Sequence, residues 1–154
     1  MILTWTTRKL QQFEVTVTFE PADNEHDDRL AFRVIMPNNM WFCLGFGETM
    51  SNTDMIAWHS ASEESFSQDY WSVSREAPVV DGSVDLETKF TRLMAKQEDV
   101  ADDYDRMVFL SYRNLDTGDS AQDYLINLRE RTDMIYAWRE RNSIWKYHSK
   151  RGNF

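Results

Sequence analysis

Met50 is the residue of this chain whose type and position point most directly to chemistry. It lies in the polar run Gly47-Glu48-Thr49-Met50-Ser51-Asn52, between the apolar stretch 41–46 and a second one at residues 55–58. A thioether fills gaps in a hydrophobic core, but it gains little from a polar turn. Thioether sulfur is also a ligand that proteins use for haem iron. Four other methionines fall at strand-like positions, where we expect them to pack: Met36, Met94, Met107 and Met134. Met50 is therefore a candidate metal ligand that needs a partner.

The three histidines are the candidate partners of Met50. Thioether and imidazole form a common axial pair for haem iron, and they approach the flat macrocycle from opposite faces. The two ligands therefore need not be close in sequence. His148 lies near the C-terminal end, and His59 directly follows the apolar residues 55–58. His26 stands in an acidic loop, where we expect it to be solvated. From the residues alone, His148 and His59 both remain open as the second ligand.

Composition argues against several other classes of function. The net charge of −9 disfavours nucleic acid as a partner, because neutralising phosphates requires clustered lysine and arginine. Three histidines and a single cysteine, Cys43, are too few for a typical zinc site and allow no disulfide within the chain. The chain lacks the nucleophile-elbow motif of serine hydrolases, and its Gly45-Phe46-Gly47 segment lacks the basic residue of a phosphate-binding loop. No stretch approaches the roughly 20 apolar residues of a membrane helix, so we expect no membrane insertion.

Alternation of apolar and polar residues with a period of two predicts strands along most of the chain. Residues 13–19 and 30–36 alternate regularly, whereas 41–46 is apolar throughout, which is typical of a strand covered on both faces. Further strands are predicted at 55–58, 70–73, 89–94, 106–113 and 133–138, with a turn or edge segment at 77–82 and a loop at 114–119. Segment 97–105 is predicted as a loop or a short helix, and 142–148 stays open between helix and strand. With no sustained helical period and no linker, residues 1–154 are predicted to form one all-β domain, an antiparallel sandwich.

Taken in order, the motifs of the chain resemble the DOMON domain family over nearly its whole length. They are Leu3-Thr4-Trp5, Trp41, Leu44-Gly45-Phe46-Gly47, Met50, Thr53-Asp54-Met55-Ile56, Asp69-Tyr70-Trp71-Ser72, Ala77-Pro78 with Asp81, Tyr112 to Asp119, Ile135-Tyr136-Ala137-Trp138 and Tyr147 to Gly152. In haem-binding members, a methionine after the first glycine-rich strand and a histidine near the C-terminal end hold the iron. The resemblance maps these ligands onto Met50 and His148, in preference to His59. It also implies an immunoglobulin-like β-sandwich.

The resemblance implies a b-type haem domain that passes single electrons, rather than an enzyme with catalytic residues of its own. We expect haem b to be held non-covalently, because no Cys-x-x-Cys-His motif is present. Either Arg151 or Lys150 is expected to pair with a haem propionate. Four aromatic residues are expected to form the pocket wall: Phe46, Trp58, Trp71 and Tyr147.

The expected partner is a redox protein, either a flavoprotein or a cytochrome b561-like protein, or else another copy of the chain. Family resemblance implies an extracellular or cell-surface location. Because the chain shows no recognisable secretion signal and no cysteine pair, an organellar setting or a processed form is the alternative. Two other functions stay open. One is a non-redox DOMON module that binds a glycan or other ligand through its aromatic rings, and the other is a structural subunit of a larger assembly.

Overall fold

The computed structural model describes residues 3–10, 13–60, 65–82, 86–93, 106–140, 148 and 150–153. Within these residues every regular element is a β-strand, and each strand pairs antiparallel with its neighbours. No helix in this part of the chain is long and apolar enough to cross a membrane. The prediction of an all-β sandwich is confirmed.

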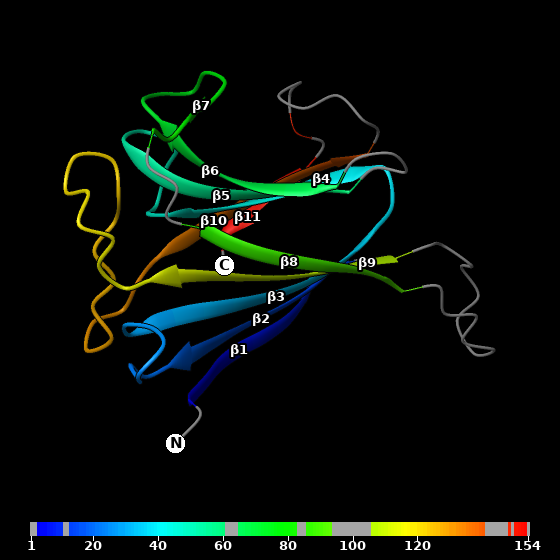
Figure 1. The fold of residues 1–154 in the computed structure, drawn as a ribbon. Coiled ribbons are helices and arrows are strands. Elements are labelled where there is room, and N and C mark those ends of the chain that lie inside the picture. Colours follow the sequence, from blue (N-terminus) through cyan, green and yellow to red (C-terminus); the bar gives the residue numbers. More distant parts are fainter. Residues whose placement is uncertain are drawn as a thin grey trace.

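Two sheets face each other, as Figure 1 shows. The five-stranded sheet has the order β1-β2-β3-β9-β8, made of β1 (Leu3–Leu10), β2 (Phe13–Glu20), β3 (Arg29–Pro37), β9 (Arg106–Asn114) and β8 (Leu86–Leu93). The six-stranded sheet has the order β11-β10-β4-β5-β6-β7, made of β11 (Lys150–Asn153), β10 (Met134–Glu140), β4 (Met40–Phe46), β5 (Thr53–Ser60), β6 (Phe66–Ser72) and β7 (Val79–Val80). The chain crosses from one sheet to the other between β3 and β4, so sequence neighbours lie in different layers.

The core lies between the two sheets and follows from the alternation in the sequence. In β9, Met107 and Phe109 are buried while Val108 between them is half-buried, as expected for a strand with one face on the core. Strands β4 and β5 differ, because every position along them is buried. Their inner faces contribute Phe42 and Trp58 to a set of stacked and tilted aromatic rings. Their outer faces are therefore covered rather than solvated, which is unusual for an antiparallel sheet and directs attention to that side.

The predicted strands correspond to strands of the structure, with longer ends in places. The predicted strand at 55–58 extends over Thr53–Ser60, and the segment 77–82 contains the short edge strand β7. Residues 97–105 and, apart from His148, residues 142–148 lie outside the described residues.

Candidate functional site

A pocket of about 540 Å³ lies on the outer face of the six-stranded sheet. Its lining comes from β4, β5, β10 and β11, from the turn between β4 and β5, and from the segment 75–78 that leads into β7. Met50 and His148 both line it, although 98 positions separate them in the sequence (148 − 50). The fold thus brings the two candidate metal ligands to one cavity.

Strand register explains why the floor of this pocket is apolar. Cys43 pairs with Ala57 on one side and with Ala137 on the other, so the three side chains lie on the same face of the sheet. Met55 lies on this face too, two residues before Ala57, and Trp41 lies two residues before Cys43. All five pack in one apolar cluster, in which Trp41, Cys43 and Met55 are almost fully buried.

Cys43 adds no reactivity to this floor. Burial, together with the nearby carboxylates of Asp54 and Asp69, raises the pKa of its thiol far above the usual range. Its sulfur therefore stays protonated at neutral pH, where it can neither attack a substrate nor bind a metal as a thiolate. The thiol packs as a small apolar group.

The turn that carries Met50 is fixed by backbone and hydroxyl hydrogen bonds. Gly47 adopts φ +146° at the start of the turn, a conformation that side chains with a Cβ rarely take. Its N–H donates to the carbonyl of Asp133 at 2.8 Å, which ties the turn to the approach of β10. At the other end the Thr53 hydroxyl donates to the carbonyl of Thr49 at 2.5 Å. Met50 is held half-buried at the edge of the pocket as a result.

His148 enters the pocket from the segment before β11, and it is also half-buried. Burial, followed by the positive charge of Arg151, lowers the pKa of the His148 imidazole below its usual value. The ring is therefore neutral at pH 7, which is the form that binds a metal ion. Arg151 is exposed, pairs with Ala137 in the sheet register and lines the pocket as well.

Three of the residues expected in the pocket wall lie instead on the opposite face of the sheet. Phe46 is buried in the core, where its ring stacks on Tyr124, and Trp58 is buried there with its indole N–H donating to the Ser111 hydroxyl at 2.9 Å. Trp71 pairs with Asp54, whose side chain also points inward, so its half-buried ring shares that face. None of the three lines the pocket. Tyr147 lies outside the described residues.

The residues that line the pocket instead were not predicted for this role from the sequence. Trp41, Cys43 and Met55 form the floor, and the segment Arg75 to Pro78 contributes to the lining. A signal for the floor was present, because residues 41–46 are apolar at odd and even positions alike. Side chains at 42, 44 and 46 that face the core leave those at 41 and 43 facing the other way.

The other two histidines lie elsewhere. His59 is buried on β5, pairs with Trp41 in the register and packs against the Phe66 ring at a centroid distance of 5.0 Å, and it does not line the pocket. His26 lies in the loop after β2, with its Nε2 atom 3.4 Å from a carboxylate oxygen of Asp23. Of the two histidines left open by the sequence, His148 lines the pocket that Met50 also lines, and His59 does not.

Comparison with known proteins assigns the family. The DOMON domain family matches residues 11–139. The fold is similar to that of the cytochrome b domain of pyranose dehydrogenase from Coprinopsis cinerea, with a TM-score of 0.60, 13% identity, and coverage of 92% of this chain and 74% of that one. It is also similar to the cytochrome domain of Myriococcum thermophilum cellobiose dehydrogenase, with a TM-score of 0.62, 10% identity, and coverage of 99% and 79%. No curated protein matches the sequence. With a match that spans most of its length and a sandwich shared with these domains, the chain belongs to the DOMON domain family.

Proposed function

We propose that this protein binds haem b non-covalently in the outer-face pocket, with Met50 and His148 as the axial ligands, and that it transfers single electrons. The observation that carries the proposal is that one pocket of a DOMON fold is lined by both side chains. The likeness to two domains that are named as cytochrome domains of dehydrogenases supports it.

The pocket suits such a group in size and chemistry. Its volume of about 540 Å³ falls within the roughly 300–1,000 Å³ of typical cofactor sites. Its floor of buried apolar side chains suits a flat hydrophobic ring, and its thioether and neutral imidazole are a recognised axial pair for haem iron. Haem supplies one-electron chemistry when it is bound. Met50 and His148 would hold the iron as its two protein ligands, which would favour electron transfer over oxygen binding.

Two arginines give the pocket positive groups for the propionate carboxylates. Arg75 and Arg151 both line it and are both exposed. Guanidinium groups bind carboxylates with two parallel hydrogen bonds, which orients the ligand as well as attracting it. From the sequence, either Arg151 or Lys150 was expected in this role; Arg151 lines the pocket, and we propose Arg75 as a second candidate because it lines the pocket too.

The redox partner is proposed to be a protein that delivers or accepts one electron at the pocket mouth, such as the flavoprotein or cytochrome b561-like partner expected from the family. The glycan-binding alternative is less well supported. Of the tryptophans whose side chains the structure describes, Trp41, Trp58 and Trp138 are buried and Trp71 is half-buried, so they form no exposed stacking platform.

Haem reconstitution of the purified protein tests the proposal. We expect one haem per chain and a six-coordinate, low-spin spectrum in both oxidation states, because a strong-field imidazole and a thioether occupy the axial positions. Absorbance spectra of the oxidised and dithionite-reduced protein are the measurement. A protein that takes up no haem, or one whose spectrum is high-spin in both states, would exclude this function.

Replacing Arg75 and Arg151 with glutamine is expected to weaken haem binding without altering the spectrum. Both guanidinium groups are exposed, so each change should raise the Kd for haem by only about two- to fivefold. Haem titration at low and high salt measures the effect, which should shrink as salt increases. Arg33→Gln is the matched control, since Arg33 is a half-exposed arginine on the other sheet. Equal losses in all three variants would show a nonspecific charge effect.

A further inference from the structure

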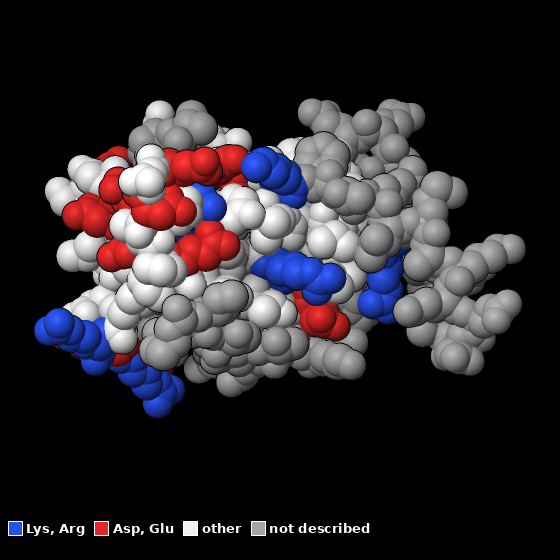
Figure 2. All heavy atoms as spheres, turned by 60° about the horizontal axis from the view of Figure 1, so that its bottom comes forward, with Lys and Arg blue, Asp and Glu red and all other residues white. Residues whose placement is uncertain are grey.

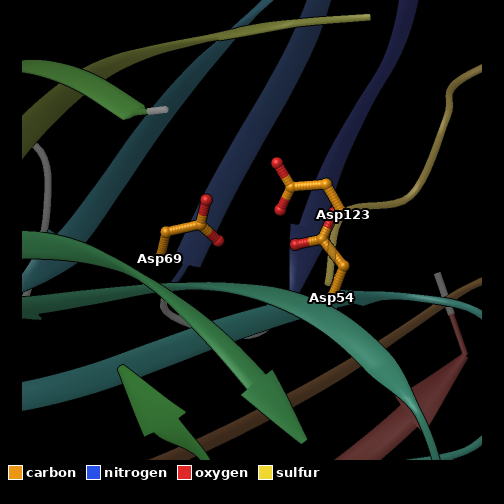
Figure 3. Close-up of side chains that lie close together, drawn as sticks. All are labelled: Asp54, Asp69 and Asp123. Carbon is orange, nitrogen blue, oxygen red and sulfur yellow. The ribbon is translucent and has the colours of Figure 1, made fainter. Parts of the chain in front are cut away.

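Three aspartates meet on the inner side of the six-stranded sheet, away from the pocket. Asp54 comes from β5, Asp69 from β6 and Asp123 from the loop after β9, and Figure 3 shows their carboxylates converging. Asp54 and Asp69 are each 1% exposed, and the side chain of Asp123 is 3% exposed. One carboxylate oxygen from each residue lies within 4.8 Å of those from the other two. Nothing in the proposed haem function uses these residues.

Hydrogen bonds within the fold satisfy only part of this cluster. Asp54 uses Oδ2 to accept from the Arg113 guanidinium and from the Tyr124 backbone N–H, the latter at 2.9 Å. Asp123 uses Oδ2 to accept from the Thr117 hydroxyl. Among the described residues, Asp54 Oδ1, Asp123 Oδ1 and both carboxylate oxygens of Asp69 have no hydrogen-bond partner. Asp69 is thus a buried carboxylate that points into the cluster, and the side chain it interacts with there is another carboxylate, that of Asp54.

The cluster contains too little positive charge to balance its carboxylates. Arg113 is fully buried, forms an ion pair with Asp54 and lies 3.9 Å from Asp123. A further buried aspartate, Asp81, adds negative charge from the segment after β7, and its N–H donates to the Asp69 carbonyl at 3.1 Å. Burial raises the pKa of Asp69 to about 8 and that of Asp123 to about 6. A buried charge without a counter-charge costs several kcal/mol, so folded proteins pair such groups or use them to hold a metal.

We propose that Asp54, Asp69 and Asp123 bind a divalent cation of the calcium type. The ligand set consists of carboxylate oxygens alone, which hard cations prefer, and it contains no imidazole or thiolate that would favour zinc or copper. Oxygens on opposite sides of a Ca²⁺ ion are at most about 5 Å apart, since Ca–O distances are about 2.3–2.6 Å. The spacing within the cluster meets this limit. Calcium fits better than magnesium, which demands near-ideal octahedral geometry.

The location suits both capture of the ion and a structural role for it. Acidic side chains gather at the end of the molecule that lies on the left in Figure 2, the end that carries the loops after β2 and β9 in Figure 1. A concentration of negative charge raises the local concentration of cations. The ion would join β5 and β6 to the loop that holds Asp123. The same loop places the buried Ile126 in the core, where its N–H donates to the Leu115 carbonyl at 3.0 Å.

Thermal unfolding of the haem-free, chelator-treated protein tests the proposal. At CaCl2 about 100-fold above Kd, the Tm of the wild type is expected to rise by about 5–10 °C, with calorimetric titration giving one ion per chain. Asp69→Asn is expected to leave the metal-free protein folded with a Tm close to that of the wild type, since asparagine has the size of aspartate, and to weaken Ca²⁺ binding at least about tenfold. Asp123→Asn should weaken Ca²⁺ binding too, and it gives a second variant on a different element. Asp116→Asn is the matched control, an exposed aspartate in the same loop region, and should behave like the wild type.

Three results would overturn the proposal. One is a wild-type Tm that does not respond to CaCl2, which would show that the carboxyl groups are neutralised by bound protons and not by a metal ion. Another is an equal rise with NaCl of matched ionic strength, which would show screening only. The third is a rise with MgCl2 but not with CaCl2, which would contradict the assignment to calcium. The experiment needs no haem, so its outcome is independent of the function proposed above.

Discussion

Replacing His148 with alanine is expected to remove the low-spin haem spectrum and to weaken haem binding by more than about 100-fold. The loss should exceed the roughly 10–100-fold that removal of an outer-shell partner costs a metal site, because His148 is proposed as a direct ligand. Its side chain is only half-buried, so the fold itself should tolerate the change. Absorbance spectra and haem titration are the measurements, and an unchanged Tm of the haem-free protein would confirm that folding is intact.

Met50→Ala is expected to act differently, because the imidazole remains. The variant should still bind haem through His148, but the iron should become high-spin because it lacks the thioether ligand. The reduction potential of the haem should fall, since a thioether favours the reduced iron. Added imidazole should restore a low-spin spectrum to both variants by filling the missing position, a rescue that a merely structural residue would not show.

His26→Ala is the control, a histidine in a loop outside the pocket. His59→Ala separates the two histidines that the sequence left open. If this variant loses the low-spin spectrum while His148→Ala keeps it, the assignment of the second ligand is wrong.

The sandwich could be predicted from the sequence because alternation with a period of two is a local signal. A strand with one face on the core shows it directly, as the alternating burial along β9 does. The register could not be predicted in the same way, since pairing joins residues far apart in the chain. Two of the residues expected in the pocket wall, Phe46 and Trp58, were chosen because they lie close to Met50 in sequence. Alternation turned them inward, and register then placed Trp58 opposite Phe42 in the core.

The aspartate cluster was harder to foresee. Asp54 directly precedes the apolar residues 55–58 and Asp69 directly precedes Tyr70 and Trp71, which is a local warning of a buried charge. The contacts that make a cluster of them are long-range, for Arg113 lies 59 residues from Asp54 and the N–H of Tyr124 lies 70 residues away. With 26 acidic residues in the chain, only the fold shows which of them meet.

Arg113→Met is expected to destabilise the fold strongly. Arg113 is fully buried, packs over the Phe46 ring at 5.0 Å and is the cation that faces Asp54 and Asp123. Removing one partner of a buried ion pair typically costs about 3–5 kcal/mol, because the remaining charge stays buried. For a domain of this size that corresponds to a fall in Tm of roughly 6–20 °C. Urea unfolding and calorimetry in EDTA, so that no divalent cation compensates, measure the loss.

The dependence of this loss on pH identifies its cause. Three aspartates with buried side chains interact with Arg113 from separate segments: Asp54 on β5, Asp69 on β6 and Asp123 in the loop after β9. The buried Asp81 after β7 adds its negative charge to these three. Burial raises the pKa of Asp54 and of Asp69, the latter to about 8, so the folded protein retains protons that the unfolded chain releases near pH 4. Carboxyl groups with raised pKa values therefore stabilise the folded state at low pH. This stabilisation is lost as the pH rises toward 8. The free energy of unfolding falls by about 1.4 kcal/mol per pH unit for each proton that only the folded state retains. Since Arg113 opposes these shifts, its removal should cost most near pH 8 and distinctly less near pH 5.

Two further variants make the test of Arg113 specific. Arg131→Met is the control, because the Arg131 side chain is 88% exposed and its Nε lies 3.0 Å from an Asp133 carboxylate oxygen. This variant should have the same Tm and the same urea midpoint as the wild type. The double variant Arg113→Met with Asp54→Asn should recover part of the lost stability, because it removes a carboxylate that the single change leaves unpaired. A loss that is equal at pH 5 and pH 8, with no recovery in the double variant, would assign the effect of Arg113 to packing against Phe46 instead of to its charge.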